Sequence, residues 1–260
     1  MKVGIIGCGI MGSALARTIV KHHELTLYDH KECHSEPLAR DIGAKACFDL
    51  NTFSKGVEVV ILATKPKQLV EIAEDLDPML SRKTLLLSIL AGTTLEALQA
   101  SFSNPTLFRL MPNLPLVCGK GMIGIVEESS QSPEDKEKVR DVLQGLGKVS
   151  WLPESLINAF TALTGSNPAF IYLIIEAMVE AGVSIGVKAS EAQELILGTI
   201  EGSLELLRSS QESLQSLRWK IASPGGTTIA GLNELEAQKV RHGVMRGIQC
   251  AYEKANEMES

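Results

Sequence analysis

The sequence predicts an α/β protein, with a parallel sheet in its N-terminal part and helices alone in the rest. Short apolar runs alternate with helical segments up to about residue 150, and strand signals stop after Trp151-Leu152-Pro153. The runs show little period-2 alternation, which indicates strands buried on both faces. Strands that alternate with helices predict a parallel sheet covered on both sides. We therefore expect one domain over residues 1–152 and an all-helical domain over residues 153–260.

The first domain is expected to contain eight strands and four helices. The expected strands cover residues 2–6, 25–28, 44–48, 57–63, 84–90, 106–110, 122–126 and 148–151. The expected helices cover residues 11–21, 67–76, 93–101 and 133–144. The last of these has a clear start, since Ser132 is a good cap, Pro133 suits the first position and Glu134 lies in the first turn.

The second domain is expected to be helical over residues 153–163, 168–186, 190–208 and from 227 to the end, with one break. Its most apolar stretch, residues 169–183, is interrupted by Glu176 and Glu180 and is shorter than a membrane span of roughly 20 residues. We expect a buried helix there and no membrane association.

Composition limits the possible functions. The chain has 260 residues and a net charge of −6, which argues against nucleic acid as a partner because phosphate binding needs a basic surface. Its five cysteines are odd in number and widely spaced, as in a reduced cytoplasmic protein. The first apolar run is too short for a signal peptide. The His and Cys spacing around residues 22–34 fits no standard zinc pattern, so no metal site is expected.

The first strand leads into a glycine-rich turn, Gly7-Cys8-Gly9-Ile10-Met11-Gly12. G-x-G-x-x-G between a strand and a helix is the dinucleotide-binding fingerprint of the Rossmann fold. Gly7 permits the tight turn, Gly9 lets the pyrophosphate approach the backbone, and Gly12 allows the helix to pack closely on the strand. The free N–H groups at the helix start then bind the phosphates.

Asp29 follows the second strand, where an acidic residue would bind the ribose hydroxyls of the adenosine. A carboxylate at this position repels a 2′-phosphate and favours NADH. His30 and Lys31, however, could hold that phosphate. The sequence therefore leaves the choice between NADH and NADPH open.

Six segments in order resemble the pyrroline-5-carboxylate reductase family over nearly the whole chain. They are IIGCGIMG at the N-terminus, ATKP at 63–66, SILAG at 88–92, RLMPNLP at 109–115, TGSNPAF at 164–170 and SPGGTTIAGL at 223–232. Leu114, Asn167 and Phe170 depart from the Thr, Gly and Tyr usual in the family, and Lys220 stands near a position that is often acidic. These departures border the expected substrate pocket.

The resemblance implies reduction of 1-pyrroline-5-carboxylate to L-proline by NADPH or NADH. The segment that begins at Ser223 suits the substrate carboxylate, because Pro-Gly favours a turn and a helix start at Thr227 or Thr228 would direct N–H groups at an anion. Without the resemblance, the residues fit an ordinary turn followed by a capped helix start as well as they fit an anion site. By resemblance, Thr228 is the candidate catalytic residue, and the substrate-binding residues are Ser223, Gly225, Gly226, Thr227 and Thr228.

The resemblance also extends the nucleotide site beyond the glycine turn. It places the segment after the fourth strand near the nicotinamide ribose, residues 88–92 in a similar position after the next strand, and Asn51 near the adenine. Residues 111–115 form either a wall near the nicotinamide or a structural loop. The expected cofactor-binding residues are Gly7, Gly9, Ile10, Met11, Gly12, Asp29, Asn51, Ala63, Thr64, Lys65, Pro66 and Ala91.

A homodimer is expected because apolar residues around 171–179 cover more than one face of a helix, and a domain of this size can bury only part of that surface. The resemblance implies an interwoven helical dimer, with active sites between the two domains; rings of dimers occur in the family. Two alternatives stay open. A β-hydroxyacid dehydrogenase would need a lysine that residues 164–170 lack, and a non-catalytic NAD(P)-binding regulator would have no need of the second anion site.

Overall fold

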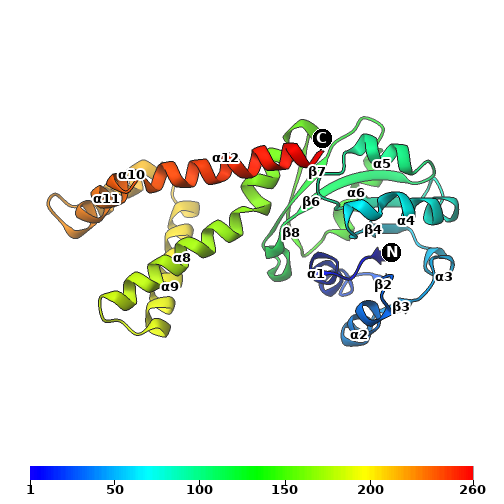
Figure 1. The fold of residues 1–260 in the computed structure, drawn as a ribbon, viewed down its shortest axis with the longest axis horizontal. Helices are drawn as coiled ribbons and strands as arrows, with labels where there is room; N and C mark the ends of the chain where they lie inside the picture. Colours follow the sequence, from blue (N-terminus) through cyan, green and yellow to red (C-terminus); the bar gives the residue numbers. More distant parts are fainter. Residues whose placement is uncertain (260) are drawn as a thin grey trace. The chain divides into compact units, whose positions relative to one another are not determined.

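The structure is a computed structural model and describes residues 1–259. The chain divides into two compact units (Figure 1). The first comprises Met1–Gly165 together with the residues from Ala251 onward, and the second comprises Ser166–Cys250. The expected domain boundary at residues 152 and 153 stays a prediction.

An eight-stranded sheet forms the centre of the first unit. The strands are β1 (Lys2–Ile6), β2 (Glu24–Tyr28), β3 (Lys45–Cys47), β4 (Val59–Leu62), β5 (Leu85–Ser88), β6 (Thr106–Pro112), β7 (Gly121–Val126) and β8 (Gly147–Leu152). Their spatial order is β3-β2-β1-β4-β5-β6-β7-β8. The first six follow the order of a dinucleotide-binding fold, in which the strand order, but not the strand direction, reverses between β1 and β4.

Helices cover both faces of this sheet, as the apolar runs predicted. On one face, α1 (Ile10–Ile19), α2 (Glu32–Ile42) and α6 (Pro133–Val142) pack on strand residues such as Val3 and Ile5. On the other, α3 (Leu50–Ser54), α4 (Leu69–Leu76), α5 (Leu95–Ser101) and α7 (Ile157–Phe160) pack on residues such as Ile6 and Leu62. Successive side chains of one strand thus enter different cores.

The sheet differs from the expectation in one respect, because it is not wholly parallel. β6 and β7 pair antiparallel, with Met111 opposite Gly124, whereas β7 and β8 are parallel to each other. Residues 113–120, which include the short 3₁₀ segment Leu114–Cys118, connect β6 to β7 and are too few for the crossover that a parallel pair requires.

The second unit is helical. It contains α8 (Asn167–Ser184), α9 (Ala189–Ser209), α10 (Leu214–Ile221), α11 (Thr227–Ala237) and the first part of α12 (Val240–Glu259), whose last turns belong to the first unit. The expectation that the apolar helix at 169–183 is buried is wrong for a single chain. No residue of α8 is buried, and Leu173 is 65% exposed. By length and composition alone, residues 154–184 could also cross a membrane.

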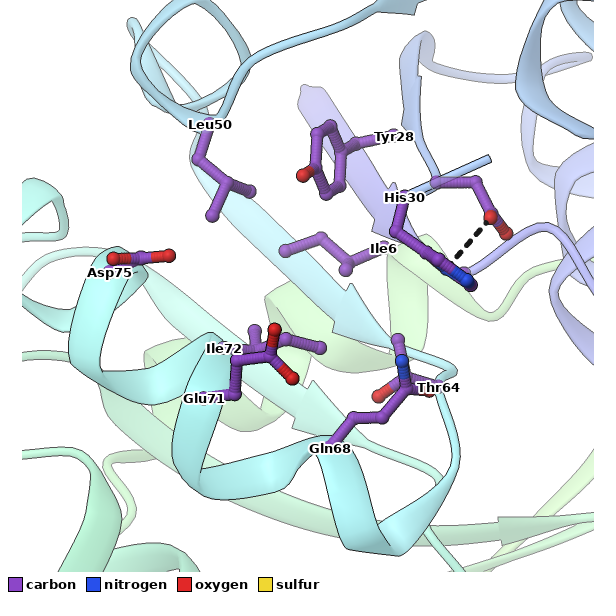
Figure 2. Close-up of a pocket in the computed structure, with 11 residues that line it drawn as sticks. Ile6, Tyr28, His30, Leu50, Thr64, Gln68, Glu71, Ile72 and Asp75 are labelled. Atoms are coloured by element: carbon purple, nitrogen blue, oxygen red, sulfur yellow. Dashed lines mark ion pairs between the residues drawn. The ribbon is translucent and has the colours of Figure 1, made fainter. Parts of the chain in front are cut away.

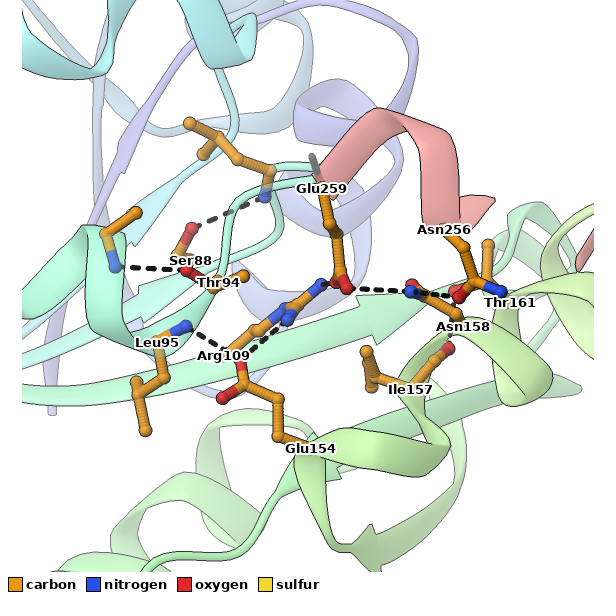
Figure 3. Close-up of polar contacts among 12 residues, drawn as sticks. Ser88, Thr94, Leu95, Arg109, Glu154, Ile157, Asn158, Thr161, Asn256 and Glu259 are labelled. Atoms are coloured by element: carbon orange, nitrogen blue, oxygen red, sulfur yellow. Dashed lines mark hydrogen bonds and ion pairs between the residues drawn. The ribbon is translucent and has the colours of Figure 1, made fainter. Parts of the chain in front are cut away.

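The end of α12 is held in the first unit by a buried arginine. Arg109 of β6 is 1% exposed and donates hydrogen bonds to Glu154, at 2.6 Å, and to Glu259 (Figure 3). Glu154 also accepts the backbone N–H of Leu95 at 2.7 Å, and Asn158 donates to Glu259 at 2.7 Å. The network therefore joins β6, the start of α5, the segment before α7 and the C-terminal helix.

Candidate active site

The glycine turn after β1 has the close packing that its sequence predicts. Gly7 has φ +99°, and a Cβ there would lie 2.6 Å from the carbonyl oxygen of Ala63. A Cβ on Gly12 would lie 1.9 Å from the carbonyl oxygen of Gly7. A Cβ on Gly9, by contrast, would meet no atom within 4 Å. Two of the glycines therefore allow internal contacts, whereas Gly9 leaves the approach to the turn open.

The start of α1 presents unpaired backbone donors. Gly9 is the N-cap and provides no side-chain hydrogen bond. The first N–H groups of a helix have no intrahelical acceptor, and they attract anions. This arrangement suits a pyrophosphate.

Asp29, directly after β2, stabilises the same turn through hydrogen bonds. Its side chain is 6% exposed, and it accepts hydrogen bonds from the backbone N–H groups of Cys8 at 2.8 Å and Lys31 at 2.9 Å. Burial, and to a lesser degree the nearby Asp29 carboxylate, raise the pKa of the Cys8 thiol to about 12. The thiol is therefore neutral and acts as a small apolar filler of the turn.

Two adjoining cavities open at the carboxyl ends of β1, β2 and β4. The larger, about 400 Å³, has a strongly cationic lining. Its lining residues are Gly7, Gly9, Asp29, His30, Lys31, His34, Ala63, Thr64, Lys65, Lys67 and Gln68. This is the edge of an open α/β sheet at which ligands bind, beside the point where the strand order reverses.

The smaller cavity, about 240 Å³, extends from there towards α4 (Figure 2). Leu50 and Tyr28 lie on one side of it, and Glu71, Ile72 and Asp75 of α4 lie on the other. It also shares Gly7, Asp29, His30, Thr64 and Gln68 with the larger cavity. The larger, cationic cavity thus continues into a smaller one with a mixed apolar and acidic lining.

A buried polar atom supports the fit of a nucleotide. The hydroxyl oxygen of Thr64 is buried without a hydrogen-bond partner, although Thr64 lines both cavities. Buried polar groups normally have partners, so an unpaired hydroxyl at a cavity wall indicates a ligand group. Together with the glycine cradle and the lysines, it fits a phosphorylated dinucleotide.

The structure gathers most of the expected nucleotide-site residues at these cavities. Gly7, Gly9, Asp29, Ala63, Thr64 and Lys65 line them, and Ile10, Met11 and Gly12 form the first turn of α1. Asn51, Pro66 and Ala91 line neither cavity; Leu50, next to Asn51, takes the place beside Tyr28. Their contacts with a nucleotide stay predictions.

Sequence reasoning missed three polar residues of the larger cavity. Lys67 and Gln68 directly follow the ATKP segment, so the predicted site ended two residues too early. His34 lies in the first turn of α2, four residues after His30, which precedes the helix, and both rings contact Asp29. The four-residue spacing of the two histidines was the available signal, but no helix was predicted over residues 32–42.

Asn113 of the RLMPNLP segment has a structural role. It is buried, its amide donates to the carbonyl of Thr164 at 2.9 Å, and its oxygen accepts the N–H of Met122 at 2.8 Å. Both ends of the amide are thus used to hold β7 and the π-helical turn Thr161–Gly165. These contacts support the structural-loop interpretation for this residue, and a position near the nicotinamide stays a prediction.

The segment from Ser223 forms a turn and a helix start within the second unit. Gly225 has φ +69°, and the N–H of Gly226 donates to the carbonyl of Ser223 at 3.1 Å. α11 begins at Thr227, as expected, and its N-cap Gly226 provides no side-chain cap. A Cβ on Gly226 would lie 2.3 Å from the Ser223 hydroxyl. The helix start therefore leaves donors open to a small anion, with the side chains of Ser223 and Thr228 close in sequence.

No cluster of three or more His, Cys, Asp or Glu side chains suited to a metal ion occurs among residues 1–259. The histidines beside the second strand instead contact Asp29.

The sheet order, the glycine turn and the cationic cavity define a dinucleotide-binding protein with a Rossmann domain. A family model described as NADP oxidoreductase coenzyme F420-dependent matches residues 2–92, and the model for pyrroline-5-carboxylate reductase dimerisation matches residues 154–258. The pyrroline-5-carboxylate reductase of Synechocystis sp. is 33% identical over 99% of this chain and 98% of its own length. The chain belongs to the pyrroline-5-carboxylate reductase family.

Two further relatives agree along the whole chain. The pyrroline-5-carboxylate reductase of Aquifex aeolicus is 34% identical over 99% of this chain and 97% of its own length. The crystal structure of Plasmodium falciparum pyrroline carboxylate reductase with NADP bound has a TM-score of 0.91 and 29% identity, and covers 100% of this chain and 98% of its own.

Proposed function

We propose that this protein reduces 1-pyrroline-5-carboxylate to L-proline with NAD(P)H, the last step of proline biosynthesis. The observation that carries the proposal is the match to pyrroline-5-carboxylate reductases over 99% of the chain. A nucleotide cradle and an open helix start for a small anion lie in the same chain, and the reaction requires both kinds of site.

The nucleotide, when bound, supplies the hydride. In our proposal the chain holds it through the turn at Gly7–Gly12, where Gly9 leaves the backbone accessible and the N-terminus of α1 stabilises the pyrophosphate. Lys65 and Lys67 add positive charge, and the free hydroxyl of Thr64 gains an acceptor. Binding and orientation are the main contribution of these residues.

The substrate is a cyclic imine with one carboxylate. A protonated imine is already electrophilic, so positioning matters more than a strong acid. We assign the carboxylate to the backbone donors at the start of α11 and to Ser223 and Thr227, and the ring nitrogen to the hydroxyl of Thr228. A threonine is a weak acid, so its contribution is modest.

The test of the reaction is a spectrophotometric assay of purified protein. We expect NADPH or NADH to be oxidised only when 1-pyrroline-5-carboxylate is supplied, and proline to form in equal amount. Folded protein that binds nucleotide but consumes none with the imine would contradict the proposal and support a regulatory protein. Oxidation of hydroxyacids at alkaline pH would favour a β-hydroxyacid dehydrogenase, although residues 164–170 contain no lysine for that chemistry.

Thr228→Ala tests the assigned hydroxyl. We expect kcat to fall by roughly 10²-fold, the lower range for a proton-donating group, while the Kd for NADPH in calorimetry stays unchanged. Thr228→Ser, which retains the hydroxyl, should recover most of the activity. An alanine variant as active as the unaltered protein would remove Thr228 from the mechanism.

We also propose that the protein is a homodimer formed by its second unit and that it acts in the cytoplasm. A groove of about 550 Å³ between α8, α9 and α10 has an almost wholly apolar lining, including Met178, Leu195 and Leu204. The family model that matches residues 154–258 describes dimerisation, which favours a second copy of this chain as the occupant. All five cysteines are free, which agrees with a compartment in which thiols stay reduced.

A further inference from the structure

Asp29 stands at the end of the second strand, where a general rule relates an acidic residue to the choice of nucleotide. An acidic residue there binds the ribose hydroxyls and disfavours a 2′-phosphate. In this structure Asp29 is buried, with Oδ2 bonded to the N–H of Cys8 at 2.8 Å and Oδ1 bonded to that of Lys31 at 2.9 Å. Its carboxylate is thus already engaged in holding the glycine turn and the start of α2.

Two imidazoles also face this carboxylate. The Nδ1 atoms of His30 and His34 lie 3.2 and 3.4 Å from Oδ1 of Asp29. The His side chains are 60% and 45% exposed, whereas that of Asp29 is 6% exposed. A ligand in the larger cavity therefore meets the histidines, and their charge, when present, screens the carboxylate.

We propose that His30, Lys31 and His34 form the recognition site for the 2′-phosphate, and that the two histidines make the preference for NADPH over NADH strongest at acidic pH. The proposal rests on the proposed function only in that the chain binds a nicotinamide dinucleotide. Lys31 provides a permanent charge next to the two rings, and all three residues line the same cavity.

The other charged groups at the cavities do not provide the same switch. Lys65 and Lys67 enter the larger cavity from the β4–α4 connection, and Glu71 and Asp75 of α4 face His30 in the smaller one. Burial raises the pKa of Tyr28, so its hydroxyl stays neutral. Histidine is the side-chain type whose charge ordinarily changes between about pH 5 and 8. The charge facing a 2′-phosphate thus falls as the pH rises.

The negative charge of the 2′-phosphate itself increases as the pH rises. Its second ionisation occurs near pH 6 by analogy with phosphorylated side chains, so it gains negative charge over the same range. A variant that keeps the hydrogen bonds but cannot gain a proton separates the two effects. His30→Gln/His34→Gln is such a variant, and its remaining pH dependence reports the ligand.

The experiment is calorimetric titration of the full-length protein with NADPH, NADH, 2′,5′-ADP and ADP at fixed ionic strength, near pH 6 and near pH 8.5. We expect the affinity for NADPH and 2′,5′-ADP to be roughly three- to tenfold greater at the lower pH, as for partly exposed charge-assisted hydrogen bonds. NADH and ADP should change by less than about twofold, since they lack the group that the histidines recognise.

His30→Gln/His34→Gln should lose this difference and retain the affinity for NADH. His22→Gln/His23→Gln is the matched control, because neither residue lines the cavities, and it should behave as the unaltered protein. A double variant at 30 and 34 that keeps the full pH dependence, or NADH and NADPH that share one pH profile, would overturn the proposal. Because only binding is measured, failure of imine reduction would leave the test intact.

Discussion

Individual glycines of the nucleotide turn have separable roles, although they belong to one motif. Gly12→Ala should destabilise the protein, because its Cβ would lie 1.9 Å from a backbone oxygen. The cost of overpacking is about 1–3 kcal/mol or more. Gly9→Ala should keep the melting temperature and lose nucleotide affinity, because its Cβ meets no protein atom but occupies the ligand's approach.

Thermal unfolding and NADPH titration of the two variants check this prediction. Equal loss of stability in both would show that the open space at Gly9 is not reserved for a ligand.

The buried thiol in the same turn should be chemically inert. A pKa of about 12 leaves almost no thiolate on Cys8 at pH 8, and thiolate is the reactive form. Iodoacetamide should therefore modify the exposed Cys33, Cys118 and Cys250 but not Cys8, as peptide mass spectrometry would show. The native pKa is raised above the ordinary 9.0, so the stability that the neutral thiol contributes is complete below that pH and is lost towards about 12. Rapid labelling of Cys8 in folded protein would contradict this environment.

At the scale of elements, the arginine network fixes the last turns of α12 in the first unit. Arg109→Met should leave the carboxylates of Glu154 and Glu259 without their cation. Breaking a buried pair costs about 3–5 kcal/mol, but these carboxylates are 32% and 22% exposed. We therefore expect a loss of about 2 kcal/mol, or roughly 4–8 °C in the melting temperature.

The matched control is Glu236→Gln, which breaks the exposed pair of Glu236 with Arg241. Exposed pairs contribute little, so its melting temperature should stay unchanged. A similar shift of the melting temperature in both variants would mean that the buried ion pairs of Arg109 stabilise the protein no more than an exposed pair does.

The accuracy of the predicted elements depended on how strong their apolar signal was. Buried strands such as β1 and β4 were predicted within a residue or two, because continuous apolar runs between turns have few alternative structures. The helices α2, α3 and α10 were missed. α2 has low apolar content and contains Pro37, whereas α3 has only five residues. The antiparallel pairing of β6 and β7 was also missed, since strand direction is set by the connection and not by the apolar run.

At the scale of the whole molecule, the sequence located motifs better than it located their partners. Gly7, Asp29 and Thr64 were predicted individually, and the sheet order brings them to one edge. Asp29 accepts a hydrogen bond from the backbone N–H of Cys8 and lies between two histidines. These contacts depend on side-chain directions, which no spacing rule gives. The same holds for Arg109, because its acceptors Glu154 and Glu259 lie 45 and 150 residues away in the chain.

Burial of the apolar surface of the second unit depends on the assembly of the protein. The prediction of a buried helix for α8 is therefore wrong for the single chain. A helix that is apolar on several sides must be covered, and the single chain leaves α8 without a buried residue. If a second copy covers it, Leu195→Glu in the groove should yield monomers, because the substitution removes about 1.5–3 kcal/mol of apolar burial and places a charge in the interface. Light scattering after gel filtration should then give 28.0 kDa instead of at least twice that mass.

Val70→Glu is the control, since Val70 of α4 is 63% exposed, close to the 64% of Leu195, but lies in the first unit. It should leave the assembly intact. A monomeric unaltered protein, or dissociation by both substitutions alike, would assign the groove to some other occupant. If the Leu195 variant is monomeric and still binds NADPH with unchanged affinity, nucleotide binding belongs to the first unit alone, because the glycine turn and both cavities are built from its residues.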